Sequence, residues 1–381
     1  MDNSDTYPTQ PNFIPIAKPD LDGNELAYLT DCIRSGWISS KGSYIERFEA
    51  ELAAWNGTRY GLVTSSGTAA LHLALLALGI GSGDEVIVPA LTYVASANVI
   101  VYTGAKPVFI DVEKETWNMD LDQLESKITP RTRAIIAVHL YGHPIHMANL
   151  QEIADRHGLW IVEDASEAFG ASVDGRRVGS LGKIGCFSFY GNKMISTGEG
   201  GCLITDLPDL AEKSRSLRNQ AKFGGEYRHS QVGYNYRMTN LQAAVGLAQM
   251  ERVEQFLSAR QTVSSWYDDY FAGQVGLYTY KQPSWGQSVC WLYSLLLETG
   301  YRFTRDELIA FLKNNGIESK PFFVPLPQLP VYQDGGAYPV ADYLSRHGIS
   351  LPMSVGLTAE QIGLIAQIVL QGLEKHAYLS G

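Results

Sequence analysis

Residues 60–88 read YGLVTSSGTAALHLALLALGIGSGDEVIV, and this stretch decides the fold class. An apolar strand pattern at 60–64 is followed by a helix pattern at 68–78, which Gly79 closes, and by a second strand pattern at 85–88. The same alternation continues downstream, with helix patterns at 92–102, 121–128 and 147–157 between strand patterns at 107–111, 133–139 and 159–163. Strands that alternate with helices of this length predict an α/β fold with a mostly parallel sheet.

The pattern changes after Gly201. Residues 240–270 form a long helix-like stretch with few helix breakers, which we expect to lead out of the first domain. Beyond it, strand patterns at 291–297 and 317–323 flank a helix pattern at 305–315. We therefore predict a flexible N-terminal arm over 1–12, a large domain over 13–255 and a smaller α+β domain over 256–381.

Composition narrows the class of protein. The 381 residues carry 40 Asp and Glu against 30 Lys and Arg, a formal net charge of −10, and 45% of them are hydrophobic. This is globular composition, and the acidic balance argues against nucleic acid or an anionic membrane as the partner. No apolar run of about 18 residues and no secretory signal is visible. The four cysteines are scattered without metal-ligand spacing, so we expect free thiols, no metal site and a cytoplasmic protein.

The first segment that could carry chemistry is Ser65-Ser66-Gly67-Thr68, which lies between a predicted strand and a predicted helix. The N-terminus of a helix offers unpaired N–H groups and a positive partial charge, and glycine lets a phosphate approach the backbone. An ordinary Ser or Thr helix cap explains the same residues. The segment alone therefore leaves both interpretations open.

The second segment places Asp164 at the carboxyl end of a predicted buried strand, the edge at which open α/β sheets bind ligands. A carboxylate there needs a cation or strong hydrogen-bond donors, and the protonated ring nitrogen of a pyridine cofactor is one such cation. Capping of the following turn is the alternative.

The third segment places Lys193 between an apolar strand and a loop that contains Gly198, Gly200 and Gly201. A lysine amine whose pKa is lowered becomes nucleophilic and can form an imine with an aldehyde cofactor. A solvated lysine in a flexible loop is the alternative.

Taken in order, these segments resemble the pyridoxal-phosphate (PLP) enzymes of the aspartate-aminotransferase fold type. More closely, the chain resembles the DegT/DnrJ/EryC1/StrS family of nucleotide-sugar aminotransferases over nearly its whole length. The motifs that carry this resemblance are Gly36-Trp37-Ile-Ser-Ser-Lys-Gly42, Gly67-Thr-Ala-Ala-Leu-His72, Gly233-Tyr-Asn-Tyr-Arg-Met-Thr-Asn240 and Leu351-Pro352.

The resemblance implies roles at matching positions. Lys193 would hold the cofactor through an imine bond and later move a proton, and Asp164 would keep the pyridine nitrogen protonated. Glu167 would lie near the phenolic oxygen of the cofactor and Tyr93 would stack on its ring. The phosphate would be bound by three residues, Gly67, Thr68 and Ser188.

The resemblance also implies a shared active site. Asn235 matches a residue that reaches the cofactor phosphate from the neighbouring subunit, so the active unit would be a homodimer or a larger assembly. Arg237 would bind the carboxylate of the amino donor, and the other residues implied to bind substrate are Trp37, Lys41 and Lys320.

Relatives that dehydrate a sugar carry His at the position of Lys193, so transamination is favoured over dehydration. Within the family the chain is most similar to the enzymes that convert GDP-4-keto-6-deoxy-D-mannose and L-glutamate to GDP-perosamine and 2-oxoglutarate. It departs from that pattern at Lys320-Pro-Phe-Phe-Val324-Pro325 and in residues 223–231. A dTDP- or UDP-linked 4-keto-6-deoxy sugar, a PLP-dependent dehydratase and a binding module without catalysis therefore remain as alternatives.

Overall fold

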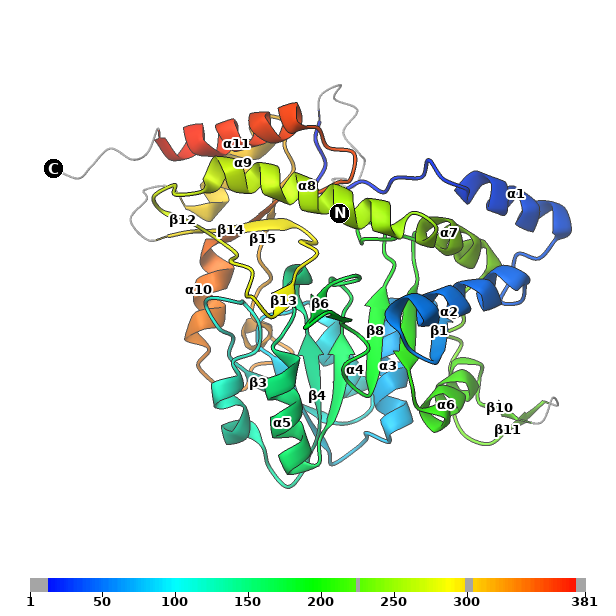
Figure 1. The fold of residues 1–381 in the computed structure, drawn as a ribbon. Coiled ribbons are helices and arrows are strands. Elements are labelled where there is room, and N and C mark those ends of the chain that lie inside the picture. Colours follow the sequence, from blue (N-terminus) through cyan, green and yellow to red (C-terminus); the bar gives the residue numbers. More distant parts are fainter. Residues whose placement is uncertain (1–12, 224–226, 299–303, 375–381) are drawn as a thin grey trace.

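The computed structural model describes residues 13–223, 227–298 and 304–374. Its centre is a seven-stranded sheet in the order β1-β9-β8-β5-β4-β2-β3, in which every strand but β9 runs in the same direction (Figure 1). The strands are β1 Tyr60–Thr64, β2 Glu85–Pro89, β3 Lys106–Ile110, β4 Thr132–Val138, β5 Trp160–Asp164, β8 Ile184–Ser188 and β9 Gly201–Thr205. The mostly parallel sheet and the α/β class that the sequence predicts are confirmed.

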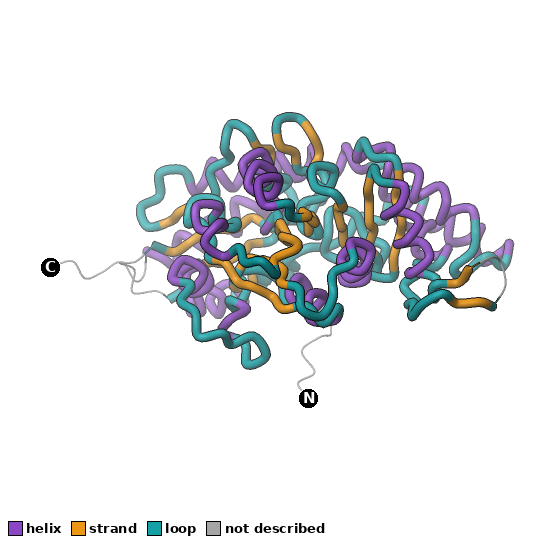
Figure 2. The backbone as a smooth tube through the Cα atoms, turned by 90° about the horizontal axis from the view of Figure 1, so that it is seen from below, coloured by secondary structure: helices purple, strands orange, loops and turns teal. Residues whose placement is uncertain are grey.

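The sheet is buried on both faces because its strands are apolar at successive positions. In β2, Val86 and Val88 belong to one hydrophobic core and Ile87 to the other. The first core includes α3 (Gly67–Leu78) and α4 (Ala95–Tyr102), and the second includes α2 (Ser43–Asn56), α5 (Met147–His157) and α7 (Asn240–Met250). Helices therefore cover both sides of the central strands (Figure 2).

A second, antiparallel sheet lies in the C-terminal part of the chain, in the order β12-β14-β16-β15. Its strands are Leu277–Thr279, Tyr293–Leu297, Gly348–Leu351 and Lys320–Pro321, and its helices are α8 (Val253–Phe271), α9 (Arg305–Asn314) and α11 (Ala359–Glu374). Helix α8 runs from the large sheet to this part of the molecule (Figure 1). Ile14 pairs with Ile317, so the N-terminal segment joins the C-terminal part. The predicted domain boundary at 255 stays a prediction.

The remaining elements are short or peripheral. They are α1 (Glu25–Ser35), α6 (Pro208–Arg218), α10 (Pro339–His347), the strands β6 Ser172–Val173, β7 Arg176–Arg177 and β13 Gly286–Gln287 of one small sheet, β10 Lys222–Phe223 with β11 Arg228–His229, and the 3-10 helices Leu121–Lys127, Leu140–Gly142 and Leu326–Gln328. None of the described helices is long and apolar enough to span a membrane.

Several predicted elements differ in detail. The helix predicted at 240–270 is two helices, because the chain leaves helical geometry at Arg252, which forms an ion pair with Asp20. The segment 121–128 is a 3-10 helix, the helix predicted from 92 begins at Ala95, and the strand predicted at 317–323 is Lys320–Pro321 alone. The predicted arm over 1–12 lies outside the described residues.

Candidate active site

A cavity of about 410 Å³ opens at the carboxyl ends of the parallel strands, where α/β sheets usually bind ligands. Its lining comes from the start of α3, the segments after β2, β5 and β8, and two residues of the C-terminal part. The lining residues are Ser66, Gly67, Thr68, Leu71, Thr92, Tyr93, Ala95, Val138, Asp164, Ser166, Glu167, Ser188, Tyr190, Asn192, Lys193, Glu199, Trp291 and Phe323.

The structure brings most of the predicted site residues together. Seven of them line this cavity, namely Gly67, Thr68, Tyr93, Asp164, Glu167, Ser188 and Lys193. The other five do not line it: Trp37, Lys41, Asn235 and Lys320 are exposed, and Arg237 is half-buried. Lys320 forms an ion pair with Glu318 at 2.8 Å, and Arg237 donates a hydrogen bond to Asn235. The roles of these five residues stay predictions.

One end of the cavity is suited to an anion. The first N–H groups of a helix have no partner within that helix, and here they belong to Gly67 and Thr68 of α3. The Ser66 side chain accepts a hydrogen bond from Ala69 N, so the helix cap weighed as an alternative is also present. A Cβ atom on Gly67 would lie 2.8 Å from Ser188 Cβ, so glycine is required to bring Ser188 this close.

Asp164 is the last residue of β5 and is 5% exposed. Its Oδ2 accepts a hydrogen bond of 2.7 Å from Ser96 Oγ, and its Oδ1 accepts one of 3.2 Å from Ser166 N. These two donors orient the carboxylate in the cavity wall. Ser96 is a residue that sequence reasoning missed, because it lies in an apolar stretch that only predicts a helix.

The Lys193 amine lies between a carboxylate and an aromatic ring. Its Nζ is 3.7 Å from Glu167 Oε1 and 3.7 Å from the centre of the Trp291 ring. Burial lowers the pKa of Lys193, while Glu167 and Asp164 oppose this effect. Burial also raises the pKa of Glu167 to about 7, although the Lys193 amine and the Tyr141 N–H group act in the opposite direction. Both pKa shifts favour the uncharged forms of Lys193 and Glu167.

Tyr141 holds Glu167 in place through its backbone. Its N–H group donates a hydrogen bond of 2.8 Å to Glu167 Oε2, and its hydroxyl oxygen accepts one of 3.1 Å from Phe323 N. Tyr141 has φ = 53°, a left-handed conformation that is uncommon for a bulky side chain. The local strain therefore coincides with contacts that shape the cavity.

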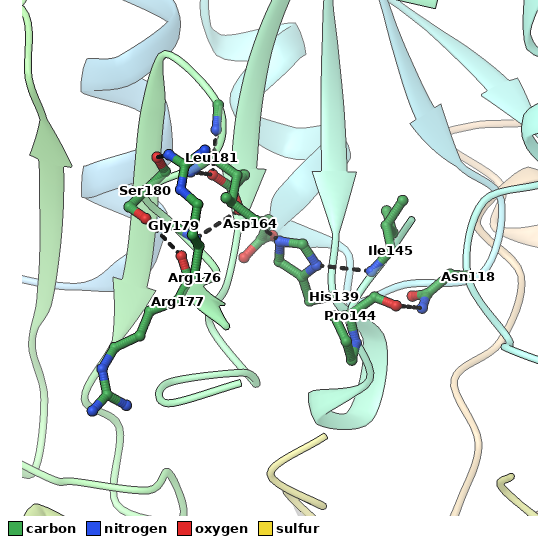
Figure 3. A network of polar contacts seen from close by, with 12 residues as sticks. Asn118, His139, Pro144, Ile145, Asp164, Arg176, Arg177, Gly179, Ser180 and Leu181 are labelled. Atoms are coloured by element: carbon green, nitrogen blue, oxygen red, sulfur yellow. Dashed lines mark hydrogen bonds and ion pairs between the residues drawn. The ribbon is translucent and has the colours of Figure 1, made fainter. Parts of the chain in front are cut away.

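A fully buried pair lies behind the cavity wall. Glu163 accepts hydrogen bonds from Gly179 N at 2.6 Å and Leu181 N at 2.7 Å, and His139 Nε2 lies 3.0 Å from its Oε2. Figure 3 shows His139 between the segment 179–181 and Ile145. The Ile145 N–H group donates a hydrogen bond to His139 Nδ1. Because Nδ1 accepts that hydrogen bond, Nε2 carries the proton that faces Glu163.

This pair also fixes the end of β5, since His139 N donates a hydrogen bond of 3.1 Å to the carbonyl oxygen of Asp164. His139 thus contacts both the carboxylate of Glu163 and the backbone of Asp164. Sequence reasoning missed the pair, because His139 only appeared at the end of an apolar strand pattern and Glu163 within another.

Sequence reasoning also missed the aromatic and polar residues that complete the cavity. Trp291 and Phe323 come from the C-terminal part, within segments that the sequence presents only as strand patterns. Residues near the predicted motifs could have been found by position alone, namely Thr92 beside Tyr93, and Tyr190 and Asn192 between Ser188 and Lys193.

Within the described parts of the chain, no group of three His, Cys, Asp or Glu side chains could hold a metal ion. All four cysteines are free thiols, and Cys32, Cys186 and Cys202 are buried.

The residues present fit PLP. An anion site at the start of α3, an oriented carboxylate on Asp164 and the amine of Lys193 line one cavity whose volume lies in the usual range for small-molecule sites. Tyr93 is 58% exposed at its mouth, where a ring can stack. The donor set therefore provides a partner for the phosphate, the ring nitrogen and the aldehyde of that cofactor.

Similarity to known proteins in sequence and in structure supports this interpretation of the cavity. Residues 19–370 match the model of the DegT/DnrJ/EryC1/StrS aminotransferase family. The chain is 46% identical over 353 residues to a GDP-perosamine synthase of Caulobacter vibrioides (92% of this chain, 95% of the relative) and 43% identical over 360 residues to that of Vibrio cholerae (93% and 98%). It superposes with a TM-score of 0.91 on a structure described as a sugar aminotransferase of Streptococcus pneumoniae in its PLP form, at 31% identity (96% and 99%). The chain therefore belongs to the DegT/DnrJ/EryC1/StrS aminotransferase family and is a PLP-dependent aminotransferase.

Proposed function

We propose that the enzyme transfers the amino group of L-glutamate to GDP-4-keto-6-deoxy-D-mannose, giving GDP-perosamine and 2-oxoglutarate. The observation that carries the reaction class is the cavity that joins Lys193, Asp164 and the N-terminus of α3. The choice of sugar is supported by the 43% and 46% identity to GDP-perosamine synthases over more than nine tenths of the chain.

When bound, PLP supplies an aldehyde that accepts an amino group and a ring that withdraws electrons from the bond being broken. Gly67 and Thr68 would bind its phosphate through their N–H groups, and Ser188 would bind it through its hydroxyl group. The Asp164 carboxylate, held by Ser96 and Ser166, would accept a hydrogen bond from the ring nitrogen and keep that nitrogen protonated.

Lys193 would first hold the cofactor and then act as an acid and a base on the substrate carbon. A base needs a lone pair, and burial lowers the pKa of Lys193 and so favours the neutral amine. Glu167 would lie beside the phenolic oxygen of the cofactor. With its pKa raised to about 7, the Glu167 carboxyl carries a proton in a large fraction of molecules near neutral pH and can donate it in a hydrogen bond.

We also propose a homodimer with shared active sites. Asn235, Trp37 and Lys41 are exposed and lie outside the cavity of their own chain, which supports contact with a second copy. In that assembly Asn235 of the partner subunit would reach the phosphate, and Arg237 would bind the glutamate carboxylate. Trp37, Lys41 and Lys320 would contact the nucleotide sugar.

Mixed subunits test the shared site. Lys193→Ala and Asn235→Ala homodimers should each be inactive or strongly impaired, whereas a refolded mixture should regain activity because one of its two sites keeps both residues. If the mixture stays as inactive as the separate variants although mass analysis shows hybrid dimers, the shared site is wrong.

The substrate is tested with purified enzyme, PLP, L-glutamate and one keto sugar at a time. We expect mass spectrometry to show an amino sugar from GDP-4-keto-6-deoxy-D-mannose, formed in equal amount with 2-oxoglutarate, at a kcat/KM at least tenfold above that for the dTDP- and UDP-linked sugars. A preference for the dTDP- or UDP-linked sugar would support that alternative. Loss of water from the sugar without an amino product would favour a dehydratase.

The cellular compartment is part of the same proposal. The four cysteines are free, and three of them are buried, which is typical of proteins kept in a reducing compartment. We therefore propose the cytoplasm, to be tested by cell fractionation with an antibody against the native chain.

A further inference from the structure

Arg260 is a buried cation in an unusual setting. It lies on α8 and is 4% exposed, and among the described residues it forms no ion pair with a carboxylate. Its Nη1 donates a hydrogen bond of 2.6 Å to the carbonyl oxygen of Trp291 and lies 3.5 Å from that of Cys290. A buried charge without a counter-ion is costly, and carbonyl oxygens compensate only part of that cost.

The segment that Arg260 holds is the one that carries Trp291. The Trp291 N–H group donates to the Tyr141 carbonyl oxygen at 3.0 Å, and its indole Nε1 donates to that of Asn192 at 2.9 Å. Arg260 binds the remaining polar group, the carbonyl oxygen. Cys290, directly before it, has φ = 47°, a left-handed conformation that needs such support.

The Lys193 amine in turn lies over the Trp291 ring, with Nζ 3.7 Å from the ring centre. Arg260 and Lys193 also line one small cavity behind the active site, together with Lys18 and Asp20. Two cations that share a buried region disfavour each other's charged form.

The charges that face Lys193 act in opposite directions. Glu167 and Asp164 favour its ammonium form, whereas burial and the positive charge of Arg260 favour the neutral amine. Among the described residues that act on the pKa of Lys193, Arg260 is the cation, and it comes from α8, an element that contributes nothing to the wall of the 410 Å³ cavity.

We infer that Arg260 is a positioning residue of the transamination site: it fixes the Trp291 backbone so that the indole ring supports the Lys193 amine, and it places a buried positive charge behind that amine. This inference rests on the proposed role of Lys193. It assigns no contact between Arg260 and the substrate or the cofactor.

The test uses Arg260→Met, which keeps the bulk of the side chain and removes both the charge and the donors, and Arg260→Lys, which keeps the charge and loses the planar fork. Gln261→Met is the matched control, because it places the same side chain at the neighbouring, exposed position of α8. Each apoprotein receives PLP, and borohydride reduction followed by peptide mass analysis measures the rate of covalent attachment to Lys193 as a function of pH.

For Arg260→Met we expect attachment at neutral pH to slow, because the amine that has lost the neighbouring positive charge is protonated in a larger fraction of molecules, and to recover at higher pH. Arg260→Lys should keep the wild-type pH midpoint with a lower rate. In turnover both variants should lower kcat by a larger factor than they change KM for the keto sugar, and Gln261→Met should match the wild type.

A wild-type rate and pH midpoint in Arg260→Met would overturn the inference. So would a loss that is equal at every pH and accompanied by a lower melting temperature, because that pattern indicates a structural role. If Arg260→Met does not fold, Arg260→Lys and Trp291→Leu decide, and wild-type attachment in both overturns the inference. Failure of the wild type to attach PLP at Lys193 would instead refute the proposed function.

Discussion

Glu167 should make the apoprotein less stable as the pH rises through the neutral range. Burial raises the pKa of its carboxyl from the usual 4.5 to about 7, so the folded chain binds a proton that the unfolded chain releases. The stability linked to that proton is fully present below pH 4.5 and is lost as the pH rises through about 7. Glu167→Gln has nearly the same shape and does not titrate, so it should remove this dependence.

The magnitude follows from the two pKa values. Their difference of about 2.5, at about 1.4 kcal/mol for each pKa unit, corresponds to about 3 kcal/mol. Lys193 has the opposite sign, because a lowered amine pKa makes stability rise with pH. That contribution belongs to the range between its lowered pKa and the usual 10.5.

The assay is urea unfolding of the apoprotein at several pH values between 4.5 and 7.5, with free energies from linear extrapolation. We expect the stability of Glu167→Gln relative to the wild type to increase by about 3 kcal/mol across this range. The same substitution at the exposed Glu199, on the rim of the cavity, controls for loss of a carboxylate. Parallel curves for the wild type and Glu167→Gln would refute the reasoning.

Three further changes test other parts of the site. Lys193→Ala should abolish turnover and covalent attachment of PLP while far-ultraviolet circular dichroism stays unchanged; full activity would contradict the assignment. In Gly201→Ala the new Cβ would lie 2.5 Å from Gly67 N, so we expect a loss of about 1–3 kcal/mol in thermal unfolding and weaker PLP binding by titration, whereas Gly191→Ala, with open space around it, should bind as the wild type does. Glu163→Gln places an amide group among backbone N–H donors and should cost about 2–3 kcal/mol in urea unfolding; an unchanged midpoint would argue against the buried network.

The large sheet could be predicted because each of its strands is locally recognisable. Residues 133–138 are apolar at nearly every position, which suits a strand covered on both faces, and the helix pattern at 68–78 is long and uninterrupted. The break between α7 and α8 was not predicted, because Glu251 and Arg252 are compatible with a helix. At this point Arg252 forms an ion pair with Asp20, a contact across more than 200 residues that a local pattern does not reveal.

Within the site, residues at the ends of recognisable elements could be predicted and those brought in by tertiary packing could not. Asp164 ends a strand and Gly67 begins a helix, so their positions follow from local pattern and from the rule for parallel sheets. Ser96 contacts Asp164 across 68 residues, and Trp291 reaches Lys193 from the C-terminal part of the chain. No spacing in the sequence indicates either contact.

Trp291 and Arg260, which no local pattern singles out, both lie close to the Lys193 amine. An amine on the surface stays protonated at neutral pH, so a lysine that must act as a base needs a setting that removes water and places a cation close by. Burial in the cavity removes water from the amine, and Arg260 of α8 is the nearby cation. Glu167 is itself shifted toward its uncharged form, which weakens its attraction for the ammonium form of Lys193. Chemistry that the sequence locates at one lysine is thus set by elements on both sides of the cavity, and its pH dependence should respond to substitutions at residues that touch neither substrate nor cofactor.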